Sequence, residues 1–94
     1  MGTEAVALLE VQANVAAIAG LDAMVKAANV RLIHVERRLG GRLVTVVVEG
    51  SVSAVTAALE AGKAAAAAVG NVKCAEVIAR PHADIMKFVK TDKA

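Results

Sequence analysis

The chain has 94 residues and a net charge of +2, and 57% of its residues are hydrophobic although it holds one Phe and no Trp or Tyr. Two domains are excluded, because each half would be too short to bury a core without metals or disulfides. The apolar content and the ordinary charged fraction of 21% exclude a disordered chain. Every apolar run is cut by charge or Gly before the roughly 20 residues that a membrane-spanning helix needs. We therefore expect one soluble domain over 1–94, with a core at about 4–88, a loose tail at 90–94 and apolar surface left for self-association.

Charge and cysteine content limit the classes of partner. The net charge is too small to indicate nucleic-acid binding, and single-strand binders stack bases on aromatic side chains that are nearly absent here. Cys74 is the one cysteine, so no internal disulfide is expected, and no Cys/His spacing indicates zinc. The first residues lack the features of a signal peptide. We expect a cytoplasmic protein with no nucleic-acid or membrane partner.

The first half of the chain predicts a strand, a helix and a hairpin. Val and Leu over 3–12 are typical of a buried strand, and Asn14 is a candidate N-cap for a helix over 15–28. Apolar residues at spacings of three and four predict the buried face of this helix: Ile18, Leu21, Val25 and Ala28. Residues 30–38 and 43–49 then predict two strands, because the second is rich in β-branched residues and a Gly-Gly turn joins them.

Alternation along 30–38 predicts which side chains share a face of the first hairpin strand. One face is expected to hold Arg31, Ile33, Val35 and Arg37, and the other Leu32, His34, Glu36 and Arg38. We expect His34 to be solvated, because a lone histidine without a catalytic partner is usually structural.

The second half predicts a long helix, a strand and a short closing helix. Ser51 is placed to cap the long helix, and Gly70 fits the position after its end. A stripe of mostly short residues would let this helix lie close to a sheet: Val52, Val55, Leu59, Gly62, Ala66 and Val69. Residues 73–79 alternate as a strand, with Cys74 on one face and Ala75 on the other, and Pro81 ends it because Pro cannot donate to a sheet ladder. Residues 82–89 fit a short helix.

The predicted order β-α-β-β-α-β is the ferredoxin-like arrangement of the α+β class. It implies an antiparallel sheet with two main helices on one face and a short C-terminal helix. Because this fold hosts many unrelated functions, the function has to be inferred from side chains.

No group of residues is typical of an active site. The carboxylates are dispersed, His34 and His82 belong to distant segments, and Cys74 is typical of a small strand residue. We therefore expect no catalytic residue, no metal and no cofactor. Two polar features remain. One is the group of three arginines around the turn at 37–42, and the other is a set of polar residues at element ends: Lys26, Asn29, Arg80 and His82. Either feature is also compatible with ordinary solvated surface.

Five stretches in this order resemble the single-domain hexameric class of bacterial microcompartment shell proteins, known from carboxysomes and from metabolosomes for alcohols and aldehydes. The stretches are EAVALLEVQ (4–12), DAMVKAANV (22–30), VTVVVEGSVSAV (44–55), LEAGKAAA (59–66) and VIARPHADI (77–85). The resemblance implies a structural protein, not an enzyme, located in a cytoplasmic microcompartment shell. It further implies homohexamers that tile edge to edge, with neighbouring hexamers, other shell proteins and enclosed enzymes as partners.

The resemblance also implies residue roles. Lys26 and Arg80 would meet the next hexamer at the hexamer edge, with Asn29 and His82 supporting that junction. The hairpin turn would surround a pore at the six-fold axis, lined by Leu39, Gly40, Gly41, Arg42 and Arg38. This turn departs from the family's usual Gly-Ser-Gly loop, because it holds a leucine, lacks the serine and is one residue longer. Its arginines predict a pore that favours small polar or anionic metabolites.

Two other functions stay open. A ferredoxin-like small-molecule sensor would bind an effector between the subunits of a dimer or trimer, although the sequence offers no ligand cluster for it. Nucleic-acid binding through the arginine-rich turn ranks third, because the aromatic side chains that would support it are missing.

Overall fold

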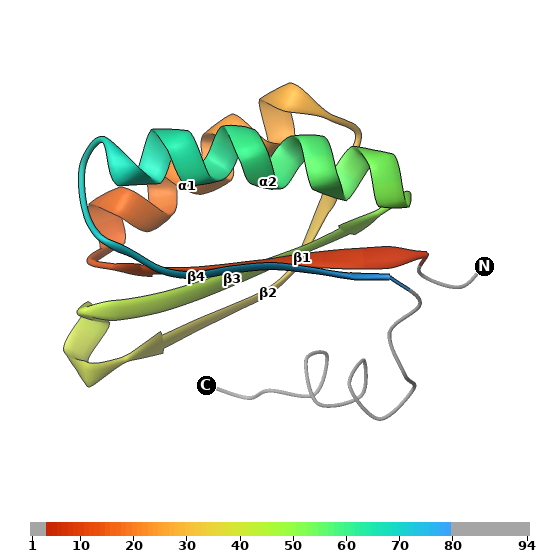
Figure 1. Ribbon diagram of the computed structural model, residues 1–94. Helices are drawn as coiled ribbons and strands as arrows, with labels where there is room; N and C mark the ends of the chain where they lie inside the picture. Colours follow the sequence, from red (N-terminus) through yellow and green to blue (C-terminus); the bar gives the residue numbers. More distant parts are fainter. Residues whose placement is uncertain (1–3, 80–94) are drawn as a thin grey trace.

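The computed structural model describes residues 4–79, and its elements follow the predicted order. They are β1 (Ala5–Gln12), α1 (Asn14–Ala27), β2 (Arg31–Arg38), the 3-10 turn η1 (Leu39–Gly41), β3 (Leu43–Gly50), α2 (Val52–Ala67) and β4 (Val72–Ala79). The strands form one antiparallel sheet in the order β2-β3-β1-β4. Figure 1 shows both helices on one side of this sheet. The α+β, ferredoxin-like prediction is confirmed, whereas the predicted closing helix at 82–89 and tail at 90–94 lie outside the described residues.

The core lies between the sheet and the helices. Alternate residues of the central strands supply it, among them Leu9 of β1 and Val46 of β3, both nearly inaccessible to solvent. The predicted alternation of β4 is confirmed, because Val77 packs toward this core whereas Ile78 packs on the opposite face. We call that opposite face, on which no helix of residues 4–79 packs, the open face.

The two helices cross at a pair of glycines. A Cβ on Gly20 would lie 2.7 Å from Leu9 Cδ2 and 3.3 Å from the main-chain oxygen of Gly62. A Cβ on Gly62 would lie 2.9 Å from Met24 Sδ. Since interiors are close-packed, neither position has room for a side chain without displacing its neighbours.

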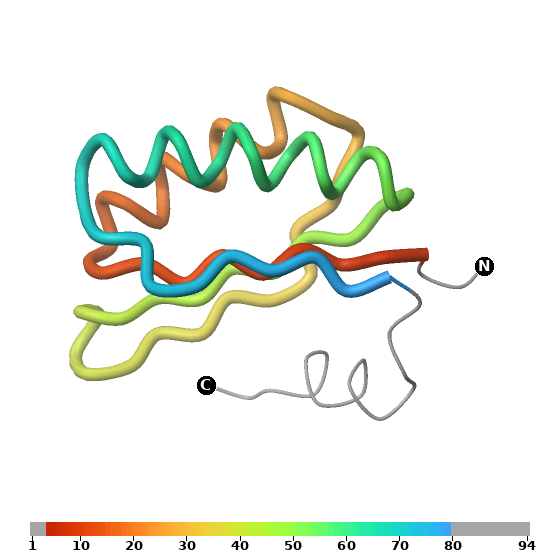
Figure 2. The backbone as a smooth tube through the Cα atoms, viewed as in Figure 1, coloured from red at the N-terminus to blue at the C-terminus, as the bar shows by residue number. Residues whose placement is uncertain are grey.

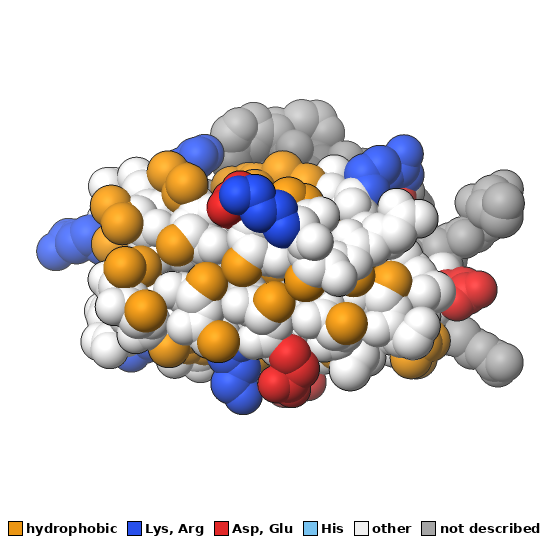
Figure 3. Space-filling model, turned by 90° about the horizontal axis from the view of Figure 1, so that it is seen from above, with side chains coloured by type: hydrophobic (Ala, Val, Ile, Leu, Met, Phe, Trp, Pro, Cys, Tyr) orange, Lys and Arg blue, Asp and Glu red, His pale blue; other side chains and the backbone are white. Residues whose placement is uncertain are grey.

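The predicted buried face of α1 is wrong for Ile18 and Val25, whereas Leu21 and Ala28 are partly buried against the core. Its buried residues are Ala16, Ala17, Gly20 and Met24. Ile18 is instead 68% exposed and Val25 45% exposed. Most residues of this helix are apolar, and the close crossing with α2 buries the side that carries Ala16, Gly20 and Met24. Figure 3, which looks onto the helices, shows hydrophobic side chains spread across this layer.

The helix ends test the predicted caps. Ser51 caps α2 as predicted, because its Oγ accepts a hydrogen bond of 3.1 Å from the Ala54 N–H. Gly70 also fits the predicted helix end, since its N–H donates to the Ala66 carbonyl at 2.9 Å. The Asn14 prediction is wrong: α1 begins at Asn14 itself, and Ala13 holds the cap position without a side-chain hydrogen bond.

Strand β2 departs from strict alternation at a β-bulge. Leu32 is level with Val48, but His34 is level with the next residue of β3, Val47, so Ile33 has no partner of its own. Both Ile33 and His34 consequently lie on the open face, where Ile33 packs beside Val47. The extra residue shifts the alternation of the strand by one position. The predicted grouping of Ile33 with Val35 is therefore wrong.

Candidate functional site

The two predicted sites lie at opposite ends of the sheet (Figure 2). The turn Leu39–Gly41 closes the β2-β3 hairpin at one end, which we call the hairpin end. Asn29 precedes β2 at the other end, which we call the junction end, and Lys26 lies in the last turn of α1 that leads there. The last described residue, Ala79, also lies at the junction end, because it pairs with Ala5 and Ala5 pairs with Gly50. Arg80 and His82 lie outside the described residues.

The hairpin loop, residues 38–42, turns through consecutive left-handed residues. The φ angles are 54° at Leu39, 67° at Gly40 and 87° at Gly41. Glycine adopts such angles readily, whereas Leu39 adopts its angle against the preference of a residue with a Cβ. Arg42 folds back over the loop, since its N–H and its side-chain Nε donate to the Leu39 carbonyl at 3.3 Å and 3.1 Å.

The hairpin loop is fastened to the start of α1. The Ala13 N–H donates to the Arg42 carbonyl at 3.0 Å, and Arg37 Nε donates to Asn14 Oδ1 at 3.3 Å. A Cβ on Gly41 would lie only 3.1 Å from Asn14 Nδ2. Asn14 is therefore a positioning residue for the loop, a role that sequence reasoning missed because 23 residues separate it from Arg37.

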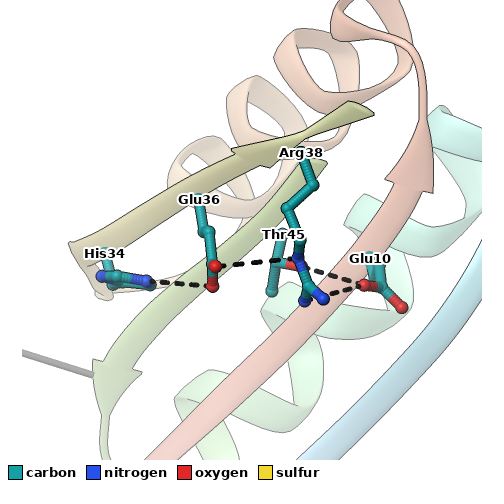
Figure 4. Close-up of polar contacts among 5 residues, drawn as sticks. All are labelled: Glu10, His34, Glu36, Arg38 and Thr45. Carbon is teal, nitrogen blue, oxygen red and sulfur yellow. Dashed lines mark hydrogen bonds and ion pairs between the residues drawn. The ribbon is translucent and has the colours of Figure 1, made fainter. Parts of the chain in front are cut away.

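A charged cluster occupies the open face behind the loop (Figure 4). Arg38 Nη2 lies 3.6 Å from Glu10 Oε2, and Arg38 Nε lies 3.6 Å from Glu36 Oε2. Thr45 Oγ1 donates to the same Glu10 oxygen at 3.2 Å. These side chains and four others surround a hollow of about 220 Å³: Leu8, His34, Val47 and Cys74. Sequence reasoning missed the role of Glu10, because Glu10 lies in β1, 28 residues before Arg38 in the chain.

The prediction that His34 is solvated is wrong. Its side chain is only 9% exposed, and its Nε2 lies 3.8 Å from Glu36 Oε1. His34 shares the open face with Glu36 and Arg38, as the alternation predicts, and there it lies among the apolar and charged side chains of the hollow. Cys74 of β4 is half-buried on the same hollow.

The junction end carries an exposed lysine. Lys26 Nζ lies 3.0 Å from Asp22 Oδ2, one helical turn earlier, and the two side chains are 74% and 57% exposed. Such a pair stabilises a helix only slightly, but it restricts the directions that the lysine samples. Sequence reasoning did not use Asp22, although the i,i+4 spacing of opposite charges is a signal that finds it. Asn29 is also exposed, and its main-chain oxygen lies against Gly50, where a Cβ would be 3.1 Å away.

Two other kinds of site are absent from the described part of the chain. Within 4–79, no three His, Cys, Asp or Glu side chains are grouped so that they could hold a metal ion. In the same part of the chain, no helix has the length and apolar character needed to cross a membrane.

Comparisons with known proteins identify relatives. The model of the BMC domain family matches residues 5–81. The bacterial microcompartment shell protein PduA of Citrobacter freundii is 51% identical over 89 residues, which cover 95% of each chain. The shell protein EutM of Escherichia coli (strain K12) is 46% identical over 82 residues, or 87% of this chain and 84% of that protein.

One solved structure gives a matching fold. A microcompartment protein from Desulfitobacterium hafniense DCB superposes with a TM-score of 0.81 at 26% sequence identity. The match covers 99% of this chain, which spans half the length of that protein. These matches confirm the resemblance drawn from the sequence stretches. The named relatives are shell proteins, in agreement with the predicted structural, non-enzymatic role.

Proposed function

Because this chain belongs to the BMC domain family of bacterial microcompartment shell proteins, we propose that it forms cyclic hexamers that tile edge to edge into the facets of a cytoplasmic microcompartment shell. The separation of the hairpin end from the junction end carries this proposal (Figure 2). A ring built from one repeated contact needs one part of each subunit at its centre and another at its rim. Elements at opposite ends of one sheet meet this requirement.

Exposed apolar surface supports the association of subunits. Val15 and Ile18, in the first turns of α1, are 65% and 68% exposed, and Val25 further along the helix is 45% exposed. Val15 and Ile18 are three residues apart and so are neighbours on the helix surface, and exposed apolar patches commonly mark a protein–protein contact. In the proposed hexamer, the contacts between subunits cover part of this apolar surface.

The hairpin loop surrounds a central pore for small polar or anionic metabolites in this proposal. Leu39, Gly40, Gly41 and Arg42 line it, with Arg38 at the base of the loop. A Cβ on Gly40 would meet nothing within 4 Å, so the loop tip has open space on its outer side. Positive charge on Arg37 and Arg42, repeated six times, raises the local concentration of anions near the axis.

The junction end provides the contact between hexamers. Lys26 is long, exposed and directed by Asp22, which suits a bond across a two-fold joint. Asn29 lies nearby, and Arg80 and His82 complete the junction as the family resemblance implies. A two-fold contact repeats each bond, so individually weak interactions add up over the edges of a tile. Neighbouring hexamers, other shell proteins and enclosed enzymes are the partners of such a tile.

A small-molecule sensor is the second candidate function. The hollow of about 220 Å³ on the open face, with charged groups on its rim, is the observation that favours it. Such a sensor would bind its effector between the subunits of a dimer or trimer, whereas a shell tile requires six subunits.

Size-exclusion chromatography with light scattering separates these candidates. A shell tile is expected to elute as one species with the mass of six chains. A uniform monomer, dimer or trimer over a range of protein concentrations would contradict the tile, and a dimer or trimer would favour the sensor.

A further inference from the structure

Between the exposed Arg38 and Arg42, the hairpin loop has a single side chain beyond its glycines, and this side chain, that of Leu39, is apolar. Leu39 is 67% exposed at the start of the turn, and the two residues that follow it are glycines. Leu39 is absent from both apolar clusters of the described residues. The main-chain oxygen of Leu39 accepts two hydrogen bonds from Arg42, so the polar part of this residue is held within the loop.

Each arginine around the turn has a partner in its own chain. The Arg37 guanidinium donates to Asn14, and that of Arg42 donates to the Leu39 carbonyl. The Arg38 guanidinium lies on the open face, 3.6 Å from the nearest oxygens of Glu10 and Glu36, so two carboxylates offset its charge. The positive charge therefore lies around and behind the loop, and the outward surface at Leu39 carries none.

On the premise that the loop surrounds a pore as proposed above, we infer that six copies of Leu39 form an apolar collar that determines its specificity. An ion that crosses an apolar constriction loses hydrating water and gains no polar partner in return. An uncharged polar molecule of similar size loses less. The arginines concentrate anions at the mouth, but the collar slows their passage, so the solute class that crosses fastest is small, polar and uncharged.

The collar is tested with two variants of similar size at the same position. Leu39→Asn replaces the apolar surface by an amide, and asparagine tolerates a positive φ better than most residues. Leu39→Met is the matched control, because methionine keeps the surface apolar. Sheets of each protein on a nanoporous support are used to measure the permeation of bromide and of ethylene glycol, with a large dextran to correct for gaps.

The expected result is a change in the ratio of the two permeabilities. In Leu39→Asn, the bromide to ethylene glycol ratio should rise about tenfold, which corresponds to a barrier lower by about 1.4 kcal/mol. In Leu39→Met it should stay at the wild-type value. Replacing the charge instead, in Arg42→Gln, should lower the permeation of bromide relative to sodium and leave ethylene glycol unchanged.

The outcomes separate the collar from the pore. If hexameric sheets pass both solutes and the ratio in Leu39→Asn equals that of the wild type, the collar is wrong and the pore stands. If neither solute crosses the sheets of the wild type or of Leu39→Asn, both the proposed pore and the proposed collar are wrong.

Discussion

The hairpin end and the junction end differ in how their side chains are held. At the hairpin end, contacts between residues far apart in the sequence fix the loop, such as the hydrogen bond from Arg37 to Asn14. At the junction end, Lys26 is 74% exposed and forms an ion pair with Asp22, a residue of its own helix. Hydrogen bonds within the chain hold the loop at one end, whereas the other end leaves a charged side chain accessible to a partner. This difference is what a ring requires of its centre and its rim.

The largest expected effect is at the junction end. We expect Lys26→Ala to leave hexamers intact and to abolish extended sheets, because it removes the exposed cation from every joint between hexamers. Light scattering measures the hexamer, and negative-stain electron microscopy measures the sheets. Lys63→Ala is the matched control, since Lys63 is an exposed lysine of α2 away from the junction end, and its sheets should be normal.

Two results would break this part of the comparison. Normal sheets in Lys26→Ala would remove Lys26 from the hexamer edge. Equal loss of sheets in Lys26→Ala and Lys63→Ala would mean that general surface charge, and not the junction end, governs tiling.

A smaller effect is expected from the two glycines of the hairpin loop. Gly41→Ala should lower the free energy of unfolding by about 2 kcal/mol and Gly40→Ala by about 1 kcal/mol, because a left-handed residue with a Cβ costs roughly that range. The two differ because a Cβ at Gly41 would lie 3.1 Å from Asn14 Nδ2, whereas a Cβ at Gly40 would meet nothing within 4 Å.

The measurement is denaturant unfolding at one fixed protein concentration, since subunit association shifts the apparent stability. Equal losses in the two variants would show that the contact between the loop and Asn14 adds no constraint. The hairpin end would then owe its shape to the turn alone.

The smallest expected effect is from Asn14→Ala. Removing the acceptor of the Arg37 Nε–H should lower the free energy of unfolding by only about 0.5–1 kcal/mol, because the hydrogen bond is exposed. Amide hydrogen exchange should be faster in the hairpin loop and unchanged at the junction end. Asn29→Ala is the control, and it should leave loop exchange unaltered. Equal loop exchange in the wild type and Asn14→Ala would show that Asn14 does not position the loop.

Several elements could be predicted from the sequence because local residues determine them. The Gly-Gly pair and the β-branched run after it predicted the hairpin, and Ser51 predicted the start of α2. The alternation of β4 was also predicted correctly. Val77 on one face packs toward the helices, and Ile78 on the other packs on the open face.

Other features depend on contacts that no local pattern records. The bulge at Ile33 places Ile33 on the same face as His34 instead of with Val35, and only the pairing with β3 reveals it. The buried side of α1 is decided by the crossing of Gly20 with Gly62, so a pattern drawn from the larger apolar residues wrongly placed Ile18 and Val25 in the core. The hydrogen bond between Arg37 and Asn14 and the ion pair between Arg38 and Glu10 also join separate elements of the fold.

The central claim is that the hairpin end lies at the centre of a hexamer and the junction end at its rim. An electron cryomicroscopy map of the assembled sheets tests it most directly. The account predicts six-fold rings in which residues 39–42 are nearest to the axis and Lys26 lies at the contact between neighbouring rings. A map with Lys26 nearest to the axis, or with rings of another order, would contradict it.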